Sequence, residues 1–536
     1  MTRSEVLNNV ERKADMVAEK KYEASYAGFV YEKPVTYWTS SEDVKRRLSR
    51  LDLKRKRNIR TGGMPIISNG RVAYADTKDG HTAIIASSGM KKSICCFMPL
   101  AQVLSKAGEN MILTDPKGEL YDRMYDSLKK EGYTVYCLDF RKMDKDCYNI
   151  LYYPTALYRS GDKEAGLSLL SDIINTLAEE QRKRAKDPFW PDTGAMWCNG
   201  TGALMMDSYP DIDQVNVVNW AEYNIRSSAA IVEEHIVPLL PNNMTKSSLN
   251  QCLSSAENTF RSILITASSF LSMFNQNPKL AAMLSCSTFT PEDLIKPKTA
   301  LFLVTDDTTS TADPILGIII RQLQSFFINK AYINKNGKLE VRENFLLDEF
   351  ASIPITDMDK ALATHRSRNI RYYLCIQSLA MLRNRYDEPE ALLANCTSVL
   401  YLGSTELELL QQLETKLGKT YITPDGSERP LCSQSELMTL EKAWDYKEAI
   451  YMNLSENIRY CTKLPAIEAY GICNDVETSG IAKSMNDYKA INEVKRYSVA
   501  RFAAEVVNGH IRAPFAQEAE NEEAPGKRYK AKKVEV

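Results

Sequence analysis

The chain alternates between short, wholly apolar runs and longer segments in which apolar residues recur every three or four positions. The first runs are "TAIIA" (82–86), "NMILTD" (110–115) and "YTVYCLDF" (133–140), and segments with helical spacing begin near Lys92 and Glu119. Uninterrupted apolar runs predict buried strands. Strands that alternate with helices indicate a parallel sheet covered on both faces.

The strand pattern stops between residues 155 and 295. Segments there, such as "AGLSLLSDIINTLAEEQRKR" and "AENTFRSILITASSFLSMF", carry apolar residues at helical spacing only. Strand-like runs then return as "KTALFLVTDD", "ENFLLDEFA", "IRYYLCIQS" and "SVLYLGS". We therefore predict an α/β fold with a parallel-rich central sheet, interrupted by an all-α insertion domain.

The pattern divides the chain into five consecutive segments. The N-terminal one is polar and ends in the basic run "VKRRLSRLDLKRKRNIRTGG", which is either a solvated helix face or a contact for DNA phosphates or an acidic membrane surface. The charged C-terminal tail is predicted to be disordered. The segments are the N-terminal one (1–62), the first part of the α/β domain (63–154), the all-α insertion (155–295), the second part of the α/β domain (296–475) and the C-terminal extension (476–536).

Composition narrows the class of protein. Hydrophobic residues make up 44% and charged residues 26% of the 536 positions, which is typical of a soluble globular protein. A net charge of −1 gives no overall attraction to nucleic acid, and no apolar run reaches the ~20 residues that a membrane-spanning helix needs. The 12 cysteines have no metal-ligand spacing, so we expect buried, reduced thiols, and the four scattered histidines form no motif.

The stretch "HTAIIASSGMKKSICCF" (81–97) has the outline of a phosphate-binding loop. Such loops have two framing glycines, but Ala86 and Lys91 occupy those positions here. A non-glycine residue with positive φ costs roughly 1 kcal/mol or more, so this Walker A loop is atypical, and an ordinary strand-to-helix turn explains it equally well. The candidate nucleotide-binding residues are Ser87, Ser88, Gly89, Lys91, Lys92 and Ser93.

An acidic pair follows the apolar strand in "NFLLDEFA". Ligands of open α/β sheets bind at the carboxyl ends of the strands, where Asp348 and Glu349 are predicted to lie. In a nucleotide hydrolase, the hydroxyl of Ser93 and the carboxylate of Asp348 would hold Mg²⁺, and Glu349 would polarise the attacking water.

Two further sets of polar residues follow along the chain. Gln377 ends the next strand, where its amide could sense a γ-phosphate or simply cap a turn. Arg366 and Arg368 precede that strand; they are candidate arginine fingers for a neighbouring subunit, or an ordinary basic pair on the surface.

Taken together, the motifs resemble the type IV coupling proteins, the TraG- and TraD-like ATPases that deliver DNA–relaxase complexes to conjugation channels. The resemblance covers about residues 80–470, and the stretch from Leu346 to Leu382 is particularly specific. The matching pieces, in the family's order, are "LTDPKGELYD" (113–122), "DPFW" (187–190), "ALFLVTDD" (300–307), "LLDEFASIPITDMDKALATHRSRNI" (346–370), "IQSLAML" (376–382), "NCTSVLYLGS" (395–404) and "KLGKTYI" (416–422).

The resemblance implies a RecA-like P-loop NTPase domain that uses ATP and Mg²⁺ and assembles into a ring, commonly a hexamer, around DNA. It implies phosphate and magnesium contacts for Lys92 and Ser93, the second nucleotide motif for Asp348 and Glu349, and a sensor role for Gln377. The helical insertion would recognise relaxase or accessory proteins. Family members usually carry N-terminal transmembrane helices, and none is evident here, so we expect a cytoplasmic protein, peripheral at the inner face of the bacterial membrane.

The sequence therefore predicts a coupling-protein-like ATPase that recruits DNA, or a relaxase–DNA substrate, and pumps it to a type IV secretion channel. One alternative is a scaffold with this fold that recruits cargo but turns over little or no ATP. A less favoured alternative is another hexameric DNA translocase.

Overall fold

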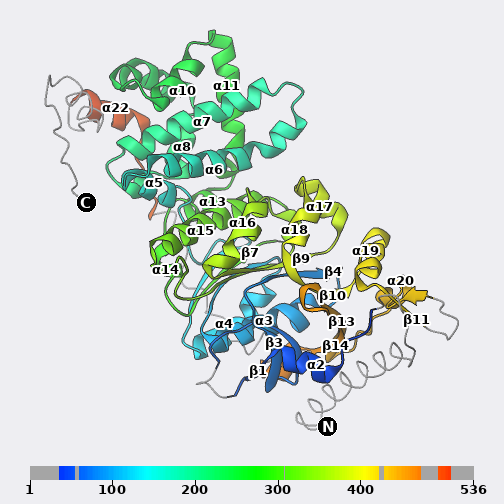
Figure 1. Ribbon diagram of the computed structural model, residues 1–536. Coiled ribbons are helices and arrows are strands. Elements are labelled where there is room, and N and C mark those ends of the chain that lie inside the picture. The colour runs from blue at the N-terminus through cyan, green and yellow to red at the C-terminus, as the bar shows by residue number, and fades with distance from the viewer. Residues whose placement is uncertain (1–35, 55–58, 307, 422–427, 473–492, 509–536) are drawn as a thin grey trace, which may run out of the picture. The chain divides into compact units, whose positions relative to one another are not determined.

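A computed structural model describes residues 36–54, 59–306, 308–421, 428–472 and 493–508 (Figure 1). The predicted disordered tail lies almost entirely outside these residues, as does most of the N-terminal segment. The chain divides into two compact units, one formed by residues 1–146 with 289–488 and the other by 147–288 with 489–536.

The first unit is built on a nine-stranded sheet with the order β14-β13-β10-β4-β9-β8-β5-β7-β6. The strands β4 to β10, consecutive in sequence, run parallel, whereas β13 and β14 pair antiparallel at one edge. This confirms the predicted α/β fold. The strands are β4 (His81–Ala86), β5 (Asn110–Asp115), β6 (Thr134–Asp139), β7 (Thr299–Val304), β8 (Glu343–Leu347), β9 (Ile370–Ile376), β10 (Cys396–Gly403), β13 (Tyr446–Asn453) and β14 (Ile458–Pro465).

Helices cover both faces of this sheet, because successive residues of its buried strands point to opposite sides. Leu346 of β8 belongs to the apolar cluster that includes residues of α3 (Met98–Ala107) and α4 (Glu119–Lys130). The preceding residue, Phe345, packs instead against Phe327 of α15 (Asp313–Ile333). The wholly apolar runs in the sequence thus correspond to strands buried on both faces.

Several shorter elements complete the first unit. They are α2 (Ser41–Arg47), the sheet β1-β3-β2 (Ser49–Asp52, Val72–Asp76, Met64–Ser68), α14 (Pro291–Leu294), α16 (Met358–Thr364), α17 (Leu379–Arg385), α18 (Pro389–Ala394), α19 (Leu407–Leu417), the hairpin β11-β12 (Lys419–Tyr421, Glu428–Pro430) and α20 (Gln434–Met438).

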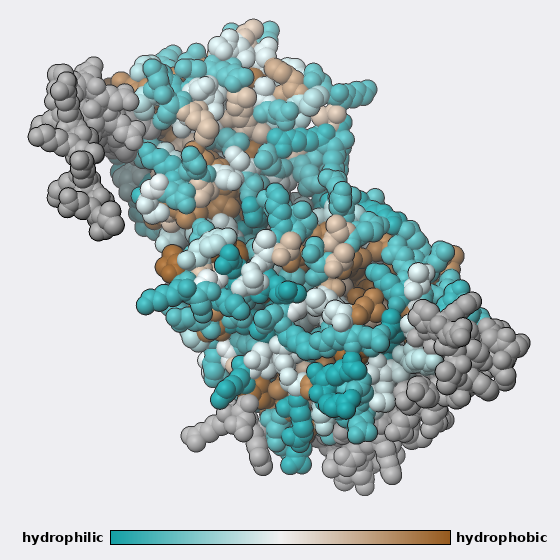
Figure 2. All heavy atoms as spheres, in the orientation of Figure 1, coloured by the Kyte–Doolittle hydropathy of each residue, from teal (hydrophilic) through white to brown (hydrophobic). Residues whose placement is uncertain are grey.

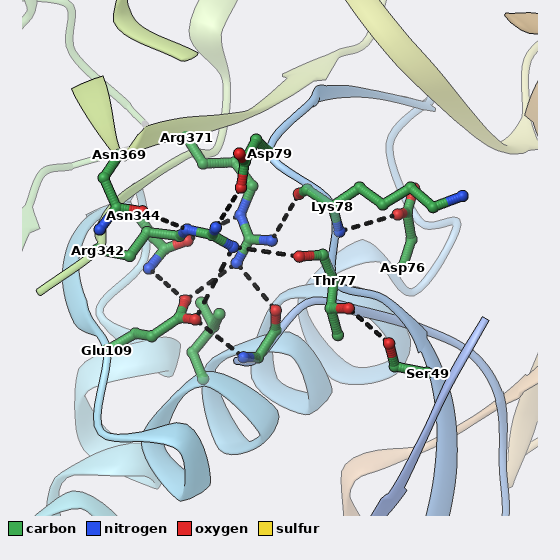
Figure 3. Close-up of polar contacts among 12 residues, drawn as sticks. Ser49, Asp76, Thr77, Lys78, Asp79, Glu109, Arg342, Asn344, Asn369 and Arg371 are labelled. Carbon is green, nitrogen blue, oxygen red and sulfur yellow. Dashed lines mark hydrogen bonds and ion pairs between the residues drawn. The ribbon is translucent and has the colours of Figure 1, made fainter. Parts of the chain in front are cut away.

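A buried polar network joins the amino ends of three neighbouring strands (Figure 3). The guanidinium of Arg371 in β9 donates to Glu109, just before β5, at 3.0 Å and to Asn344 in β8 at 3.0 Å. Arg342 donates to Asn369 at 2.9 Å and pairs with Asp79. Because Arg371 is only 1% exposed, these partners take the place of water around the buried guanidinium.

The second unit, which includes residues 147–288, consists of helices and loops, with no strand among its described residues. The described residues after 492 belong to it as well, since Tyr497 and Phe502 pack against Tyr209. Its helices are α5 (Tyr152–Arg159), α6 (Lys163–Arg184), α7 (Phe189–Ser208), α8 (Val217–Glu222), α9 (Arg226–Ile231), α10 (Met244–Leu253), α11 (Glu257–Phe270), α12 (Ser272–Gln276), α13 (Pro278–Met283) and α22 (Val499–Val507).

Within the described part of the chain, no helix has the length and apolar character required to cross a membrane. Hydrophilic residues predominate on the face that Figure 2 displays. The same residues contain no cluster of potential metal ligands formed by histidine, cysteine, aspartate and glutamate side chains.

Candidate nucleotide-binding site

The loop after β4, the candidate phosphate-binding loop of the sequence, has two residues in the left-handed conformation. Its base is fixed by the amide of Ser87, which donates to the carbonyl of Gly403 at 2.9 Å. Gly89 has φ 75° and Lys91 has φ 58°, whereas Ala86 is not among the residues with positive φ. Ala86 is therefore a mild replacement for glycine, and Lys91 holds the left-handed conformation for which glycine is the usual residue.

The side chain of Lys91 is anchored outside the loop. Its ammonium donates to the carbonyls of Ala443 at 2.5 Å and Trp444 at 2.9 Å. In the opposite direction, the ammonium of Lys442 donates to the carbonyl of Gly89 at 2.8 Å. These hydrogen bonds fasten the turn before β13 to the loop, and they hold the Lys91 side chain, which could otherwise crowd a bound phosphate.

The helix predicted from about Lys92 does begin there, but its first turn is not α-helical. Residues Ser93–Phe97 form a π-helical turn, and the α-helix α3 begins only at Met98. The amide of Cys95 still donates to the carbonyl of Lys91 at 2.9 Å. Single π turns are frequent at functional sites, and hydrophobic periodicity alone does not distinguish them from an α-helix.

Lys92 lies between the two carboxylates predicted from "LLDEF". Its ammonium is 2.8 Å from Asp348 and 3.3 Å from Glu349. Burial alone would lower the pKa of Lys92, but the two carboxylates outweigh burial and hold that pKa above its usual range. The site is thus a charge cluster whose lysine stays protonated.

Neighbouring strands hold the acidic pair in place. Thr114 at the end of β5 donates to the carbonyl of Asp348 at 2.8 Å, and Gln377 after β9 donates to the carboxylate of Glu349 at 2.8 Å. Glu349 itself has φ 55°, a conformation that is costly for a residue with a side chain and is often found at functional sites. Asp348 is 4% exposed and Glu349 31%, so the second carboxylate is the more accessible to water.

A cavity of about 160 Å³ opens between the loop and the carboxyl ends of the strands. A second hollow of about 350 Å³ adjoins it and shares Pro116, Asp348 and Glu349. The smaller cavity is lined by Ser88, Gly89, Lys91, Lys92, Ser93, Ile94, Asp115, Pro116, Lys117, Glu119, Asp348 and Glu349.

The structure brings some of the candidates from the sequence together at this cavity and places others elsewhere. Of the loop residues, Ser88, Gly89, Lys91, Lys92 and Ser93 line the cavity with the acidic pair, and Gln377 contacts Glu349.

Ser87 holds the loop to β10 and does not line that cavity. Arg366 and Arg368 precede β9 at its amino end, whereas Gln377 follows its carboxyl end. The guanidinium of Arg368 donates to the carbonyl of Gly337 and lies 4.5 Å from the ring centroid of Tyr332.

The lining residues that were not among the candidates include Asp115 and Lys117. Asp115 ends β5 and accepts a hydrogen bond from the amide of Tyr121 at 2.9 Å, and burial raises its pKa to about 7. The signal that could have identified both residues is "LTDPKG", because it follows a buried strand just as "LLDEF" does.

The polar groups around the smaller cavity are of the kinds that bind a magnesium nucleotide. Backbone amides around Gly89 and the ammonium of Lys92 could bind phosphate oxygens, and the hydroxyl of Ser93 with the carboxylate of Asp348 are the hard oxygen ligands that Mg²⁺ prefers.

Comparisons with known proteins identify a family and a shared fold. The sequence model of the family described as "Type IV secretory system Conjugative DNA transfer" matches residues 38–459. No curated protein sequence is significantly similar to the chain.

Three solved structures of the plasmid coupling protein TrwB, one with sulphate, one with ADP and Mg²⁺ and one with the ATP analogue ADPNP, share the fold. Their TM-scores are 0.59, 0.58 and 0.57, with 15%, 15% and 14% identity. Each match covers 82% of this chain and 96%, 96% and 95%, respectively, of the chain in the solved structure.

Proposed function

We propose that this chain, which belongs to the type IV secretory system conjugative DNA transfer family, is an ATPase that uses Mg²⁺-ATP to move DNA or a relaxase–DNA substrate to the secretion channel. The observation that carries the proposal is the position of Lys92, which lies beside both Asp348 and Glu349 at the carboxyl edge of a parallel sheet. Lysine and paired carboxylates at this edge are what phosphate binding and water activation require.

In the proposed cycle, Lys92 leaves its carboxylate partners and binds the terminal phosphates. Mg²⁺, held by Ser93 and Asp348, would neutralise phosphate charge when bound. Glu349 would orient and polarise the attacking water. Gln377, which donates to Glu349 at 2.8 Å, would register the presence of the γ-phosphate through this hydrogen bond.

We further propose that the active assembly is a ring, commonly a hexamer in this family, in which Arg366 or Arg368 reaches the nucleotide of a neighbouring copy. Both arginines lie at the opposite end of β9 from Gln377, so neither serves the site of its own chain. The helical unit would recognise relaxase or accessory proteins, and the ring would act at the inner face of the membrane beside the channel.

The second candidate, a scaffold without turnover, is favoured by the non-glycine residue in the left-handed position of the loop. The anchoring of Lys91 to the carbonyls of Ala443 and Trp444 argues against this scaffold, because the protein holds the side chain that could otherwise crowd a bound phosphate.

The deciding experiment measures ATP turnover by the purified chain, alone and with single- or double-stranded DNA. Lys92→Ala and Glu349→Gln are the matched variants, since the first removes the phosphate contact and the second retains size while removing the charge that activates water. DNA-stimulated turnover that both substitutions abolish is the expected result. ATP binding without turnover would support the scaffold.

A further inference from the structure

The turn before β13, residues 441–446, is held beside the phosphate-binding loop by several independent contacts. The carbonyls of Ala443 and Trp444 accept from Lys91, and Lys442 donates back to Gly89. The turn is also closed internally, because the amide of Ala443 donates to the carbonyl of Tyr446 at 3.1 Å.

A buried lysine fixes the start of this turn from the sheet side. The fully buried Lys447 of β13 donates to the carbonyls of Leu440 at 3.1 Å and Glu441 at 3.3 Å. The carboxylate of Glu441 pairs in addition with Lys463 of β14 at 2.6 Å. The position of the turn relative to the loop is therefore well defined.

Trp444 is the residue that this fixed turn presents to solvent. Its side chain is 77% exposed, the highest value among the large apolar residues in the described part of the chain. The other exposed tryptophan there, Trp190, is 37% exposed, and Trp38, Trp197 and Trp220 are buried. A large exposed indole on a turn fixed beside this loop offers an aromatic face to a ligand bound there.

We propose that the indole of Trp444 is the surface on which the base of the bound nucleotide stacks. This inference rests on the proposed function, since it adds a base subsite to the same nucleotide site. Phosphates bound by Gly89 to Ser93 leave the base to extend beyond the loop. The carbonyl of Trp444 accepts from the Lys91 ammonium at 2.9 Å, which places this residue beside the loop.

Stacking on an aromatic ring tolerates every base, because each base has a π face. This subsite would therefore increase affinity for nucleotides without choosing strictly between adenine and guanine. It would also give the anchoring lysines a second role, since Lys91 and Lys442 hold the platform at a fixed distance from the phosphates.

The test compares two probes, Mg-ADP and Mg-tripolyphosphate, by calorimetric titration of the full chain and its Trp444→Ala and Trp444→Phe variants. Loss of one base–aromatic stack weakens binding by roughly 5- to 100-fold, so Trp444→Ala should lose that much affinity for Mg-ADP. Its affinity for Mg-tripolyphosphate should not change. Trp444→Phe, which keeps an aromatic face, should stay within about threefold of the wild type for both probes.

Tryptophan fluorescence supplies an independent readout. Mg-ADP should quench the emission of the wild type, and this quenching should disappear in Trp444→Phe and persist in the matched control Trp190→Phe. Light scattering of each variant tests whether Trp444 contacts a second copy instead, because loss of such a contact would lower the molecular mass.

Three outcomes would overturn the inference. They are equal affinity of wild type and Trp444→Ala for Mg-ADP, an equal loss for both probes, and a lower mass of Trp444→Ala without a selective loss of Mg-ADP. If the wild type binds neither Mg-ADP nor Mg-ATP, the proposed function itself fails and the base subsite fails with it.

Discussion

Lys91 shows how a single side chain can replace a glycine when its surroundings engage it. Its backbone has φ 58°, and its ammonium contacts Ala443 and Trp444. Substitution by alanine or by glycine removes the ammonium equally, so the two variants differ only in a Cβ atom on a left-handed backbone.

We expect Lys91→Ala to be less stable than Lys91→Gly by on the order of 1 kcal/mol, because the strain on alanine exceeds the entropy that glycine loses on folding. Urea unfolding of both variants measures this difference. An alanine variant at least as stable as the glycine variant would mean that residue 91 does not keep a positive φ in solution.

The buried carboxyl of Glu343 should make the stability of the protein depend on pH. Its carboxyl is fully buried, one oxygen accepts from Asn110 at 2.7 Å, and the other has no partner among the described residues. Burial raises its pKa to about 8. A raised pKa means that the folded protein favours the protonated carboxyl of Glu343. The stability that this group contributes is therefore fully present below its unfolded pKa of about 4.5, and it is lost as the pH rises to about 8.

Glu343→Gln, which is neutral at every pH, should therefore be more stable than the wild type at pH 8, by a few kcal/mol. The gain should shrink towards pH 5, where the buried carboxyl is already protonated. Urea unfolding at the two pH values measures the gain. An equal gain in the free energy of unfolding at pH 5 and pH 8 would show that Glu343 has an ordinary pKa.

At the scale of elements, the network around Arg371 links strands whose other ends form the site. Glu109, Asn344 and Arg371 lie at the amino ends of β5, β8 and β9, and these strands lead to Thr114, Asp348 and Gln377. Removing one partner of a buried ion pair leaves the other charge without compensation.

Arg371→Met should lower the free energy of unfolding by roughly 3–5 kcal/mol, as measured by urea denaturation. Glu109→Gln in the same chain should restore part of this loss, because the buried negative charge is then removed as well. A double variant no more stable than Arg371→Met would contradict a direct pairing of the two residues.

The strands that form the site could be predicted from sequence because they are buried on both faces and therefore read as continuous apolar runs. The predicted runs 110–115 and 133–140 correspond to β5 and β6 within one residue. β13 and β14 were missed, because charged residues such as Lys447 and Lys463 interrupt their apolar pattern. The contact between Lys91 and the turn before β13 was thus outside what the pattern could indicate.

At the scale of the whole molecule, the candidate nucleotide site is assembled from segments that precede and follow the helical unit in the sequence. The loop at 86–93 precedes that unit in sequence, and Asp348, Glu349 and Gln377 follow it. Sequence order could suggest that these motifs share one sheet. It could not reveal that Lys92 contacts both carboxylates, since that depends on the order of strands β4, β9 and β8 in the sheet.

The chain leaves for the helical unit and returns from it at adjacent points. The amide of Thr288 donates to the carbonyl of Cys147 at 3.0 Å, and the amide of Cys147 donates to the hydroxyl of Thr288 at 3.0 Å. Three apolar clusters of the first unit, among them the one that includes Ala86 and Phe97 beside the loop after β4, contain no residue of the helical unit. The core that supports this loop therefore does not include residues 148–287.

We expect a chain that ends at residue 472 and has a short Gly-Ser linker in place of residues 148–287 to fold and to bind Mg-ADP within about threefold of the full chain. Ending at 472 also removes Tyr497 and Phe502, whose packing partner Tyr209 is lost with the helical unit. Calorimetric titration measures the affinity, and Lys92→Ala in the shortened chain is the control that should abolish binding. A shortened chain that folds but does not bind Mg-ADP would mean that the helical unit contributes to the site, because the loop, the acidic pair and Gln377 are all retained.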